Sequence, residues 1–204
     1  FIGMELDEIT EGGDCKDVVA QYFPPDWTIV RLYDRDRTYS KQASIDAINA
    51  GTHFVNIAAH ANYRFVGELT AADVAGLINT VYPIIYSVGC YSCEIDNRVP
   101  SDPDSTGEYI TYASRGAVAM MGNTRYGWYM PGYPGMGPSD LFDQAFFYYI
   151  FNGYPTLGEA FCWSKDSIGP AGTYWSYVYY EQILFGDPAL LAVDIPPTPP
   201  EILD

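Results

Sequence analysis

Two short apolar stretches decide how this chain folds, and a potentially reactive side chain follows directly after each of them. Residues 53–60 read HFVNIAAH and residues 84–90 read IIYSVGC. Strands that are apolar at nearly every position are typical of a parallel sheet covered on both faces. Because a single helical pattern separates the two stretches, we expect them to form neighbouring parallel strands.

The alternation of strand and helix patterns continues along most of the chain. Strands are expected at residues 1–5, 28–33, 53–59, 84–89, 117–121 and 189–193. Helices are expected at residues 14–22, 41–50, 70–79, 105–114, 139–151, 156–167 and 175–184, several of them after a capping residue such as Asp14, Ser40 or Thr70. This order predicts an α/β fold, a sandwich in which helices cover both faces of a mainly parallel sheet.

Composition excludes several classes of protein. The 204 residues are 48% hydrophobic and 18% charged, which is ample for one core and too apolar for disorder. The net charge of −16 would repel phosphate backbones, so we expect no nucleic-acid partner. No apolar run is long enough for a membrane span. Few lysines and 19 tyrosines fit a secreted acidic protein.

The two ends of the chain suggest a piece of a longer protein. Residues 1–4 open as a strand already in progress, and residues 195–204 (IPPTPPEILD) have the composition of a stiff Pro-rich linker. We therefore expect one domain over residues 1–194, a linker over residues 195–204, and further domains in the same chain.

His60 and Cys90 directly follow the two strands expected at residues 53–59 and 84–89. In an open α/β sheet, ligands bind beyond the carboxyl ends of the strands, where both residues would lie. A thiol becomes a nucleophile when a base such as histidine is nearby, and the same imidazole can protonate a leaving amine. The alternative is a packed cysteine and a polar strand end, with no chemistry.

Three motifs carry a resemblance to a known family. They are AAHANY around His60, YSVGCYSC around Cys90 and FGDPAL at residues 185–190, and residues 30–51 and 117–121 also match. In their order and spacing, the chain resembles the catalytic domain of the gingipain-type cysteine peptidases, which belong to the caspase-like clan. The resemblance extends from about residue 28 to the linker and implies a caspase-like three-layer sandwich.

The resemblance also implies an activity. Cys90 would be the nucleophile, His60 the acid and base, and the backbone N–H groups of Ala61 and Cys90 an oxyanion hole. The expected function is that of a secreted or cell-surface prokaryotic endopeptidase that acts on protein or peptide substrates through a thioester, with no cofactor required.

Accessory roles follow from the same resemblance. Trp128, in the loop 122–138 (GNTRYGWYMPGYPGMGP), would wall the first specificity pocket, Glu5 would orient His60, and Asp14 would attract a basic substrate side chain. Each has a plainer interpretation: a loop anchor for Trp128, a solvated carboxylate for Glu5, and a helix cap for Asp14. Calcium is a candidate structural ion for the acidic loop with Glu94, Asp96, Asp102 and Asp104, although a solvated loop is the simpler interpretation.

One departure from the family pattern opens an alternative function. The family has glycine after the catalytic histidine, whereas this chain has Ala61, followed by Asn62 and Tyr63. A positive φ would strain an alanine, and its methyl group could crowd the substrate. The alternative hypothesis is therefore a catalytically impaired relative that binds peptides or partner proteins.

Overall fold

The computed structural model describes residues 1–96 and 103–193. Residues 97–102 and the expected linker at 195–204 lie outside the described residues. The strands are β1 (Ile2–Gly3), β2 (Glu5–Asp7), β3 (Thr10–Glu11), β4 (Leu32–Tyr33), β5 (Phe54–Ala58), β6 (Ala61–Asn62), β7 (Phe65–Val66), β8 (Leu69–Thr70), β9 (Ile84–Ser87), β10 (Ala119–Asn123) and β11 (Gln182–Phe185). The helices are α1 (Gly12–Ala20), α2 (Lys41–Gly51), α3 (Ala71–Ala75), α4 (Thr106–Tyr112), α5 (Pro138–Phe151), α6 (Leu157–Ile168) and α7 (Thr173–Glu181).

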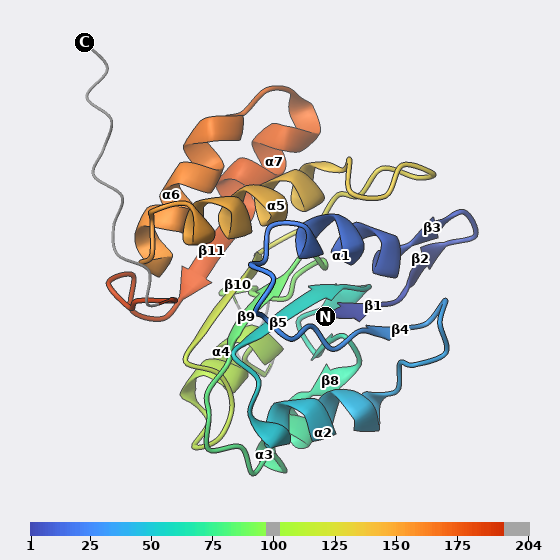
Figure 1. Ribbon diagram of the computed structural model, residues 1–204, viewed down its shortest axis with the longest axis vertical. Helices are drawn as coiled ribbons and strands as arrows, with labels where there is room; N and C mark the ends of the chain where they lie inside the picture. Colours follow the sequence, from blue (N-terminus) through green and yellow to red (C-terminus); the bar gives the residue numbers. More distant parts are fainter. Residues whose placement is uncertain (97–102, 194–204) are drawn as a thin grey trace.

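A central sheet of six strands organises the molecule, in the order β11-β10-β9-β5-β1-β4 (Figure 1). All neighbouring pairs are parallel except β10 and β11. The two apolar stretches of the sequence form the central pair β5 and β9, with Phe54 opposite Ile84 and Ile57 opposite Ser87. This register places the carboxyl ends of both strands side by side, as expected.

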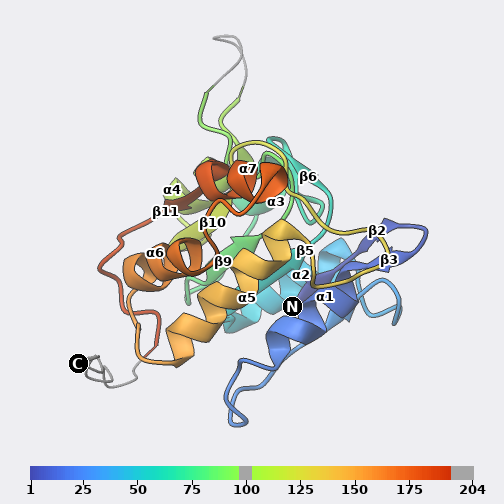
Figure 2. The ribbon, with the colours of Figure 1, turned by 90° about the horizontal axis from the view of Figure 1, so that it is seen from above.

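Helices cover both faces of this sheet. In Figure 1, α1, α5, α6 and α7 lie above the sheet, and α2, α3 and α4 lie below it; Figure 2 looks down onto the upper layer. Each face has its own buried cluster, one centred on Phe146, Phe147 and Tyr86 and the other on Ile57, Ile85 and Met120. The structure thus confirms the expected caspase-like three-layer sandwich with a mainly parallel sheet.

Local capping signals place most helices correctly. Ser40 caps α2, Thr156 caps α6, and capping boxes pair Thr70 with Asp73 and Ser105 with Glu108. The expectation that Asp14 caps the first helix is wrong, because α1 already begins at Gly12 and Asp14 lies in its first turn. An acidic side chain is favourable in that turn because it faces the positive end of the helix dipole.

The expected last strand at residues 189–193 is also wrong. The last strand is β11, which begins directly where α7 ends and pairs antiparallel with β10. Leu191 makes only an isolated bridge to Thr156. The FGDPAL turn therefore follows the final strand instead of leading into it. The sequence misses β11 because its four residues continue the helical pattern of α7.

A buried polar cluster ties the upper helix layer to the centre of the sheet. Lys16 of α1 is fully buried and forms an ion pair with the fully buried Asp143 of α5. Asn56 of β5 accepts a hydrogen bond from Lys16 at 2.6 Å and donates one to Asp143 at 2.8 Å. Burial raises the pKa of Asp143, and the charge of Lys16 opposes that rise. The three side chains satisfy one another in a place that water does not reach.

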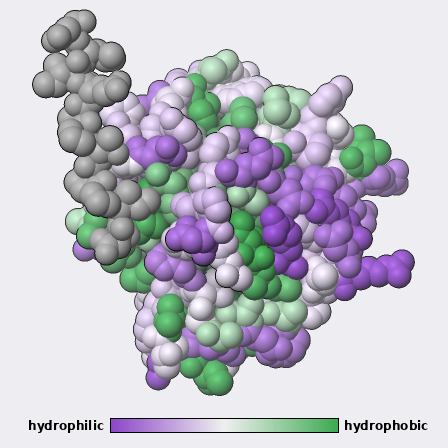
Figure 3. Space-filling view, viewed as in Figure 1, coloured by the Kyte–Doolittle hydropathy of each residue, from purple (hydrophilic) through white to green (hydrophobic). Residues whose placement is uncertain are grey.

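Exposed charges gather elsewhere. Asp17 of α1 pairs with Arg31 and Arg35 near β4, on the face where Figure 3 shows hydrophilic residues around α1 and β4.

Within the described part of the chain, no helix is both long and apolar enough to cross a membrane.

We predict that Asp143→Ala lowers the free energy of unfolding by about 3–5 kcal/mol, because it leaves the Lys16 ammonium buried without its counter-charge. The matched control Asp36→Ala removes a single exposed ion pair, the one with Arg35, and should cost at most about 1 kcal/mol. Urea unfolding followed by circular dichroism measures both. Equal costs for the two variants would contradict the stabilising role given to the buried pair.

Candidate active site

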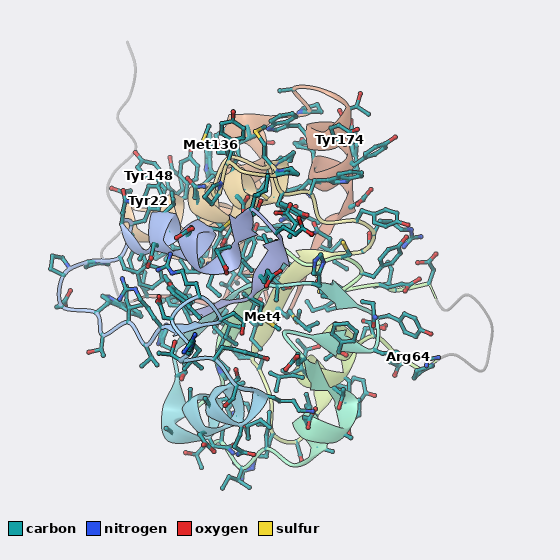
Figure 4. All side chains as sticks on the ribbon, turned by 90° about the vertical axis from the view of Figure 1, so that its right-hand side faces the viewer. Met4, Tyr22, Arg64, Met136, Tyr148 and Tyr174 are labelled. Atoms are coloured by element: carbon teal, nitrogen blue, oxygen red, sulfur yellow. The ribbon has the colours of Figure 1, made fainter. Side chains whose placement is uncertain are left out.

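His60 and Cys90 both lie just beyond the carboxyl ends of the paired strands β5 and β9. Both line one small cavity of about 60 Å³, together with Leu6, Ala59, Val88, Gly89, Gly127, Tyr129 and Ser139. This end of the sheet is at the right in Figure 1 and faces the viewer in Figure 4. His60 is exposed and Cys90 is partly buried, so the imidazole lies nearer the solvent than the thiol does.

Hydrogen bonds to backbone carbonyls hold the loop after β9 to the end of β10. Asn123, the last residue of β10, donates its side-chain N–H to the carbonyls of Val88 at 3.1 Å and Gly89 at 3.2 Å. The N–H of Tyr91 donates to the Arg125 carbonyl at 2.5 Å, and Tyr91 has a left-handed φ of 53°. The chain thus turns sharply at the residue after Cys90, which leaves the thiol at the mouth of the cavity.

Gly127 closes the other side of the thiol. Its carbonyl lies 3.7 Å from Cys90 Sγ. A Cβ on residue 127 would lie 1.9 Å from the Val88 carbonyl oxygen, so the two backbones can approach this closely only with glycine at this position.

The thiol of Cys90 is not activated by charge in this state. Burial raises its pKa above the ordinary value, backbone contact with Gly127 lowers it in part, and the Glu181 carboxylate raises it again. Cys90 is therefore protonated near neutral pH and needs a base to become a nucleophile.

His60 is oriented by a backbone group. Its Nε2 lies 2.8 Å from the carbonyl oxygen of Leu6 in β2. A carbonyl can only accept a hydrogen bond, so Nε2 carries the proton and Nδ1 is the basic nitrogen of the neutral ring. Glu5, expected to orient His60, lies one residue before Leu6 with its side chain exposed. The group that lies against Nε2 is a main-chain carbonyl, and the orienting role of Glu5 stays a prediction.

Ala61 fits its position without strain. It belongs to β6 and pairs with Val66 of β7, and the non-glycine residues with positive φ in the described ranges are Arg37, Glu68 and Tyr91. A Cβ built on Gly89 would lie 2.5 Å from the Ala61 methyl group. The methyl therefore packs towards the backbone of Gly89, and the extended backbone explains why alanine is tolerated here.

Trp128 and Asp14 lie in different surroundings. Trp128 follows Gly127 and packs against Tyr174 of α7, with ring centroids 4.4 Å apart. Asp14 forms an ion pair with Arg35 and lines neither the cavity of Cys90 nor the pocket of Trp128.

The other cysteines and the acidic loop lie apart from this cavity. Cys93 and Cys15 are buried, and burial raises the pKa of each thiol, whereas Cys162 is exposed on α6. Asp96 pairs with Arg125 and Asp104 accepts a hydrogen bond from Tyr112, while Asp102 lies outside the described residues. Over the described ranges, no group of three or more potential ligands is arranged to hold a metal ion.

Comparison with known proteins places this geometry in a family. The sequence profile of peptidase family C25 matches residues 1–192. The chain belongs to peptidase family C25. No curated protein sequence matches it.

Solved structures agree on the fold. The chain is similar to the Arg-specific cysteine proteinase gingipain R (RgpB), with a TM-score of 0.71 and 19% identity over 87% of this chain and 41% of that one. It is also similar to the complex of the pro- and mature domains of RgpB from Porphyromonas gingivalis, with a TM-score of 0.70 and 19% identity over 87% and 42% of the two chains. A third structure, described as a protease, has a TM-score of 0.62 and 18% identity over 88% and 44%. The chain thus spans about two fifths of the length of these proteins.

Sequence reasoning missed the groups that hold the two reactive side chains in place. Asn123 and Gly127 lie in the stretch GNTRYG, whose glycines mark a loop but do not reveal what the loop contacts. The Leu6 carbonyl carries no side-chain signal at all. Only the packing of β10 beside β9, and of β2 beside the end of β5, brings these groups to the cavity.

We predict that Asn123→Ala speeds alkylation of Cys90 by iodoacetamide at least about threefold, because the turn that keeps the thiol partly buried loosens, and costs about 1–3 kcal/mol of stability, because two carbonyls lose their donor. Mass spectrometry of the labelled peptide and urea unfolding measure the two effects. The control Asn152→Ala removes an exposed amide that bonds the Tyr148 carbonyl, and it should leave both quantities unchanged.

We predict that alkylation of Cys90 rises with pH through a midpoint above the ordinary thiol value of about 8.5, because burial favours the neutral thiol. The measurement is the initial alkylation rate between pH 5 and pH 10, followed for Cys90 alone. A plateau already reached below pH 7 would instead show a stable thiolate–imidazolium pair and would refute this prediction.

Proposed function

We propose that this C25 domain is the catalytic part of a secreted or cell-surface prokaryotic cysteine endopeptidase, with Cys90 as nucleophile and His60 as acid and base. One observation carries the proposal: the thiol and the imidazole, from two strands far apart in sequence, line the same small cavity. The family match supports peptide-bond chemistry in that cavity.

In the acylation step, Cys90 Sγ attacks the carbonyl carbon of the substrate, and its proton passes to Nδ1 of His60. The thiol needs this transfer because burial keeps it protonated in the free enzyme. When the tetrahedral intermediate collapses, the C–N bond breaks and the imidazolium gives its proton to the leaving amine. The products of this step are a thioester on Cys90 and the released amine fragment.

Water then completes the cycle. His60 takes a proton from a water molecule, which attacks the thioester carbonyl, and the proton returns to Sγ as the C–S bond breaks. The carboxylic acid fragment leaves and the thiol is restored, so the cycle needs no cofactor. The hydrogen bond that Nε2 donates to the Leu6 carbonyl keeps Nε2 protonated, which reserves Nδ1 for both proton transfers.

We assign the oxyanion hole to the backbone N–H groups of Ala61 and Cys90, which belong to the two strand ends that flank the cavity. Such donors act on the charge that develops in the tetrahedral intermediate. The tight contact between Ala61 and Gly89 supports this assignment, because it keeps the two strand ends at a fixed separation.

A binding module without catalysis is the second candidate. The observation that favours it is the combination of a small cavity with a thiol whose pKa is raised by burial. In that case the site would accept a peptide at the strand ends without forming a thioester.

The test is cleavage of an unstructured protein such as casein, with the products identified by mass spectrometry. We predict that Cys90→Ala abolishes cleavage and that His60→Ala lowers kcat/KM by about 10²–10⁴-fold, the usual contribution of acid–base catalysis. Cys162→Ala, which removes an exposed thiol of α6, should retain full activity. Circular dichroism should show that all three variants are folded.

Absence of cleavage by the folded wild-type chain, together with saturable peptide binding, would overturn the peptidase and support the binding module. Equal activity of wild type and Cys90→Ala would exclude Cys90 as the nucleophile.

A further inference from the structure

We infer that the specificity pocket beside the candidate active site takes an apolar, preferably aromatic, side chain of the substrate and rejects a basic one. This inference rests on the proposed peptidase function and names the substrate class for the same site. The substrate residue concerned is the one whose carbonyl carbon Cys90 attacks.

The second pocket adjoins the cavity of Cys90. It has a volume of about 290 Å³ and is lined by Trp128, Tyr129, Met130, Pro131, Pro138, Tyr174 and Trp175. Tyr129 lines both spaces, and the backbone of Gly127, which contacts the thiol, leads directly into Trp128. A peptide whose carbonyl lies at Cys90 can therefore place a neighbouring side chain in this pocket.

Aromatic rings form most of the pocket wall. Trp128 packs on Tyr174 at 4.4 Å between ring centroids and lies nearly parallel to Tyr177 at 6.3 Å. Figure 4 shows Tyr174 on α7, at the upper right of that view. An apolar cavity of about 150 Å³ is large enough to bind benzene, so this pocket has room for an aromatic side chain.

Among the residues that the structure describes, no charged side chain lines this pocket. Asp14, the sequence-based candidate for attracting a basic side chain, is engaged by Arg35, which also bonds Asp17. Glu181, at the far end of α7, is partly buried near Arg125 and Tyr126, and its carboxyl pKa is raised mainly by burial. Asp7 contacts Tyr129, and the Glu181 carboxylate acts on the Cys90 thiol, so acidic groups do lie near the site. None of these carboxylates lines the second pocket.

The balance of energies favours an apolar occupant. A guanidinium or ammonium group moved into an uncharged pocket loses most of its hydration. Cation–π attraction to the aromatic faces returns only a small part of that loss. A phenyl or phenol ring loses little hydration and gains the stacking contacts of Trp128 and Tyr174.

The test uses peptidyl acyloxymethyl ketones that carry Phe, Tyr, Leu, Ala, Arg, Lys or Asp next to the reactive group. The quantity measured is the second-order rate of adduct formation on Cys90, followed by mass spectrometry of the intact protein. We expect the Phe and Tyr reagents to react at least about tenfold faster than the Arg and Lys reagents, within the usual range for an apolar pocket.

Two variants of α7 link that preference to the pocket. Tyr174→Ala should slow the Phe reagent about tenfold and leave the Ala reagent within about twofold. The matched control is Tyr180→Ala on the same helix; Tyr180 is 73% exposed, lies against Tyr179 and does not line the pocket, so all rates should stay unchanged.

The outcomes separate the two proposals. Adducts on Cys90 that form fastest with Arg or Lys, or at the same rate with every reagent, would overturn the apolar preference and leave the peptidase intact. If no reagent modifies Cys90 in the folded chain although iodoacetamide does, the peptidase proposal fails and the substrate class fails with it.

Discussion

The buried contact among Lys16, Asn56 and Asp143 is the constraint on which the upper half of the molecule depends. It joins α1, β5 and α5 at a place without water, where each charge or dipole has a partner only if all three elements are in register. A shift of α1 along the sheet would leave an ammonium or a carboxylate unpaired at a cost of several kcal/mol. Asn56 lies in β5, the strand that leads to His60. This cluster therefore also holds in place the strand that carries His60.

The site itself is built from main-chain contacts around two side chains. Asn123 holds the turn that carries Cys90, the Leu6 carbonyl orients His60, and glycine at 127 lets the backbone approach the end of β9. These contacts position the two side chains but do not by themselves activate the thiol, because burial raises its pKa and keeps it neutral. In the proposed mechanism, the chemistry begins only when a substrate carbonyl and the imidazole are both in place.

The aromatic residues divide between packing and recognition. Rings such as Phe146 and Phe147 are buried under the upper helices and contribute to the core. Tyr174 and Tyr177 are about half exposed beside Trp128, where their faces remain available to a ligand. The long loop 122–138 therefore contributes to both spaces. Gly127 contacts Cys90, and its neighbour Trp128 begins the wall of the second pocket.

Sequence patterns predict the layers, the parallel strands β5 and β9, the capped helices and the placement of His60 and Cys90 at one edge of the sheet, because hydrophobic period, capping chemistry and strand order are local properties that parallel topology converts into position. Five features appear only in the folded chain: the ion pair of Asp14, the main-chain carbonyl beside His60, the unstrained backbone at Ala61, the antiparallel β11 and the uncharged pocket beside Trp128. The physical reason is that each depends on a partner distant in sequence: Arg35 for Asp14, Leu6 beside His60, Gly89 against Ala61, β10 for β11, and Tyr174 against Trp128.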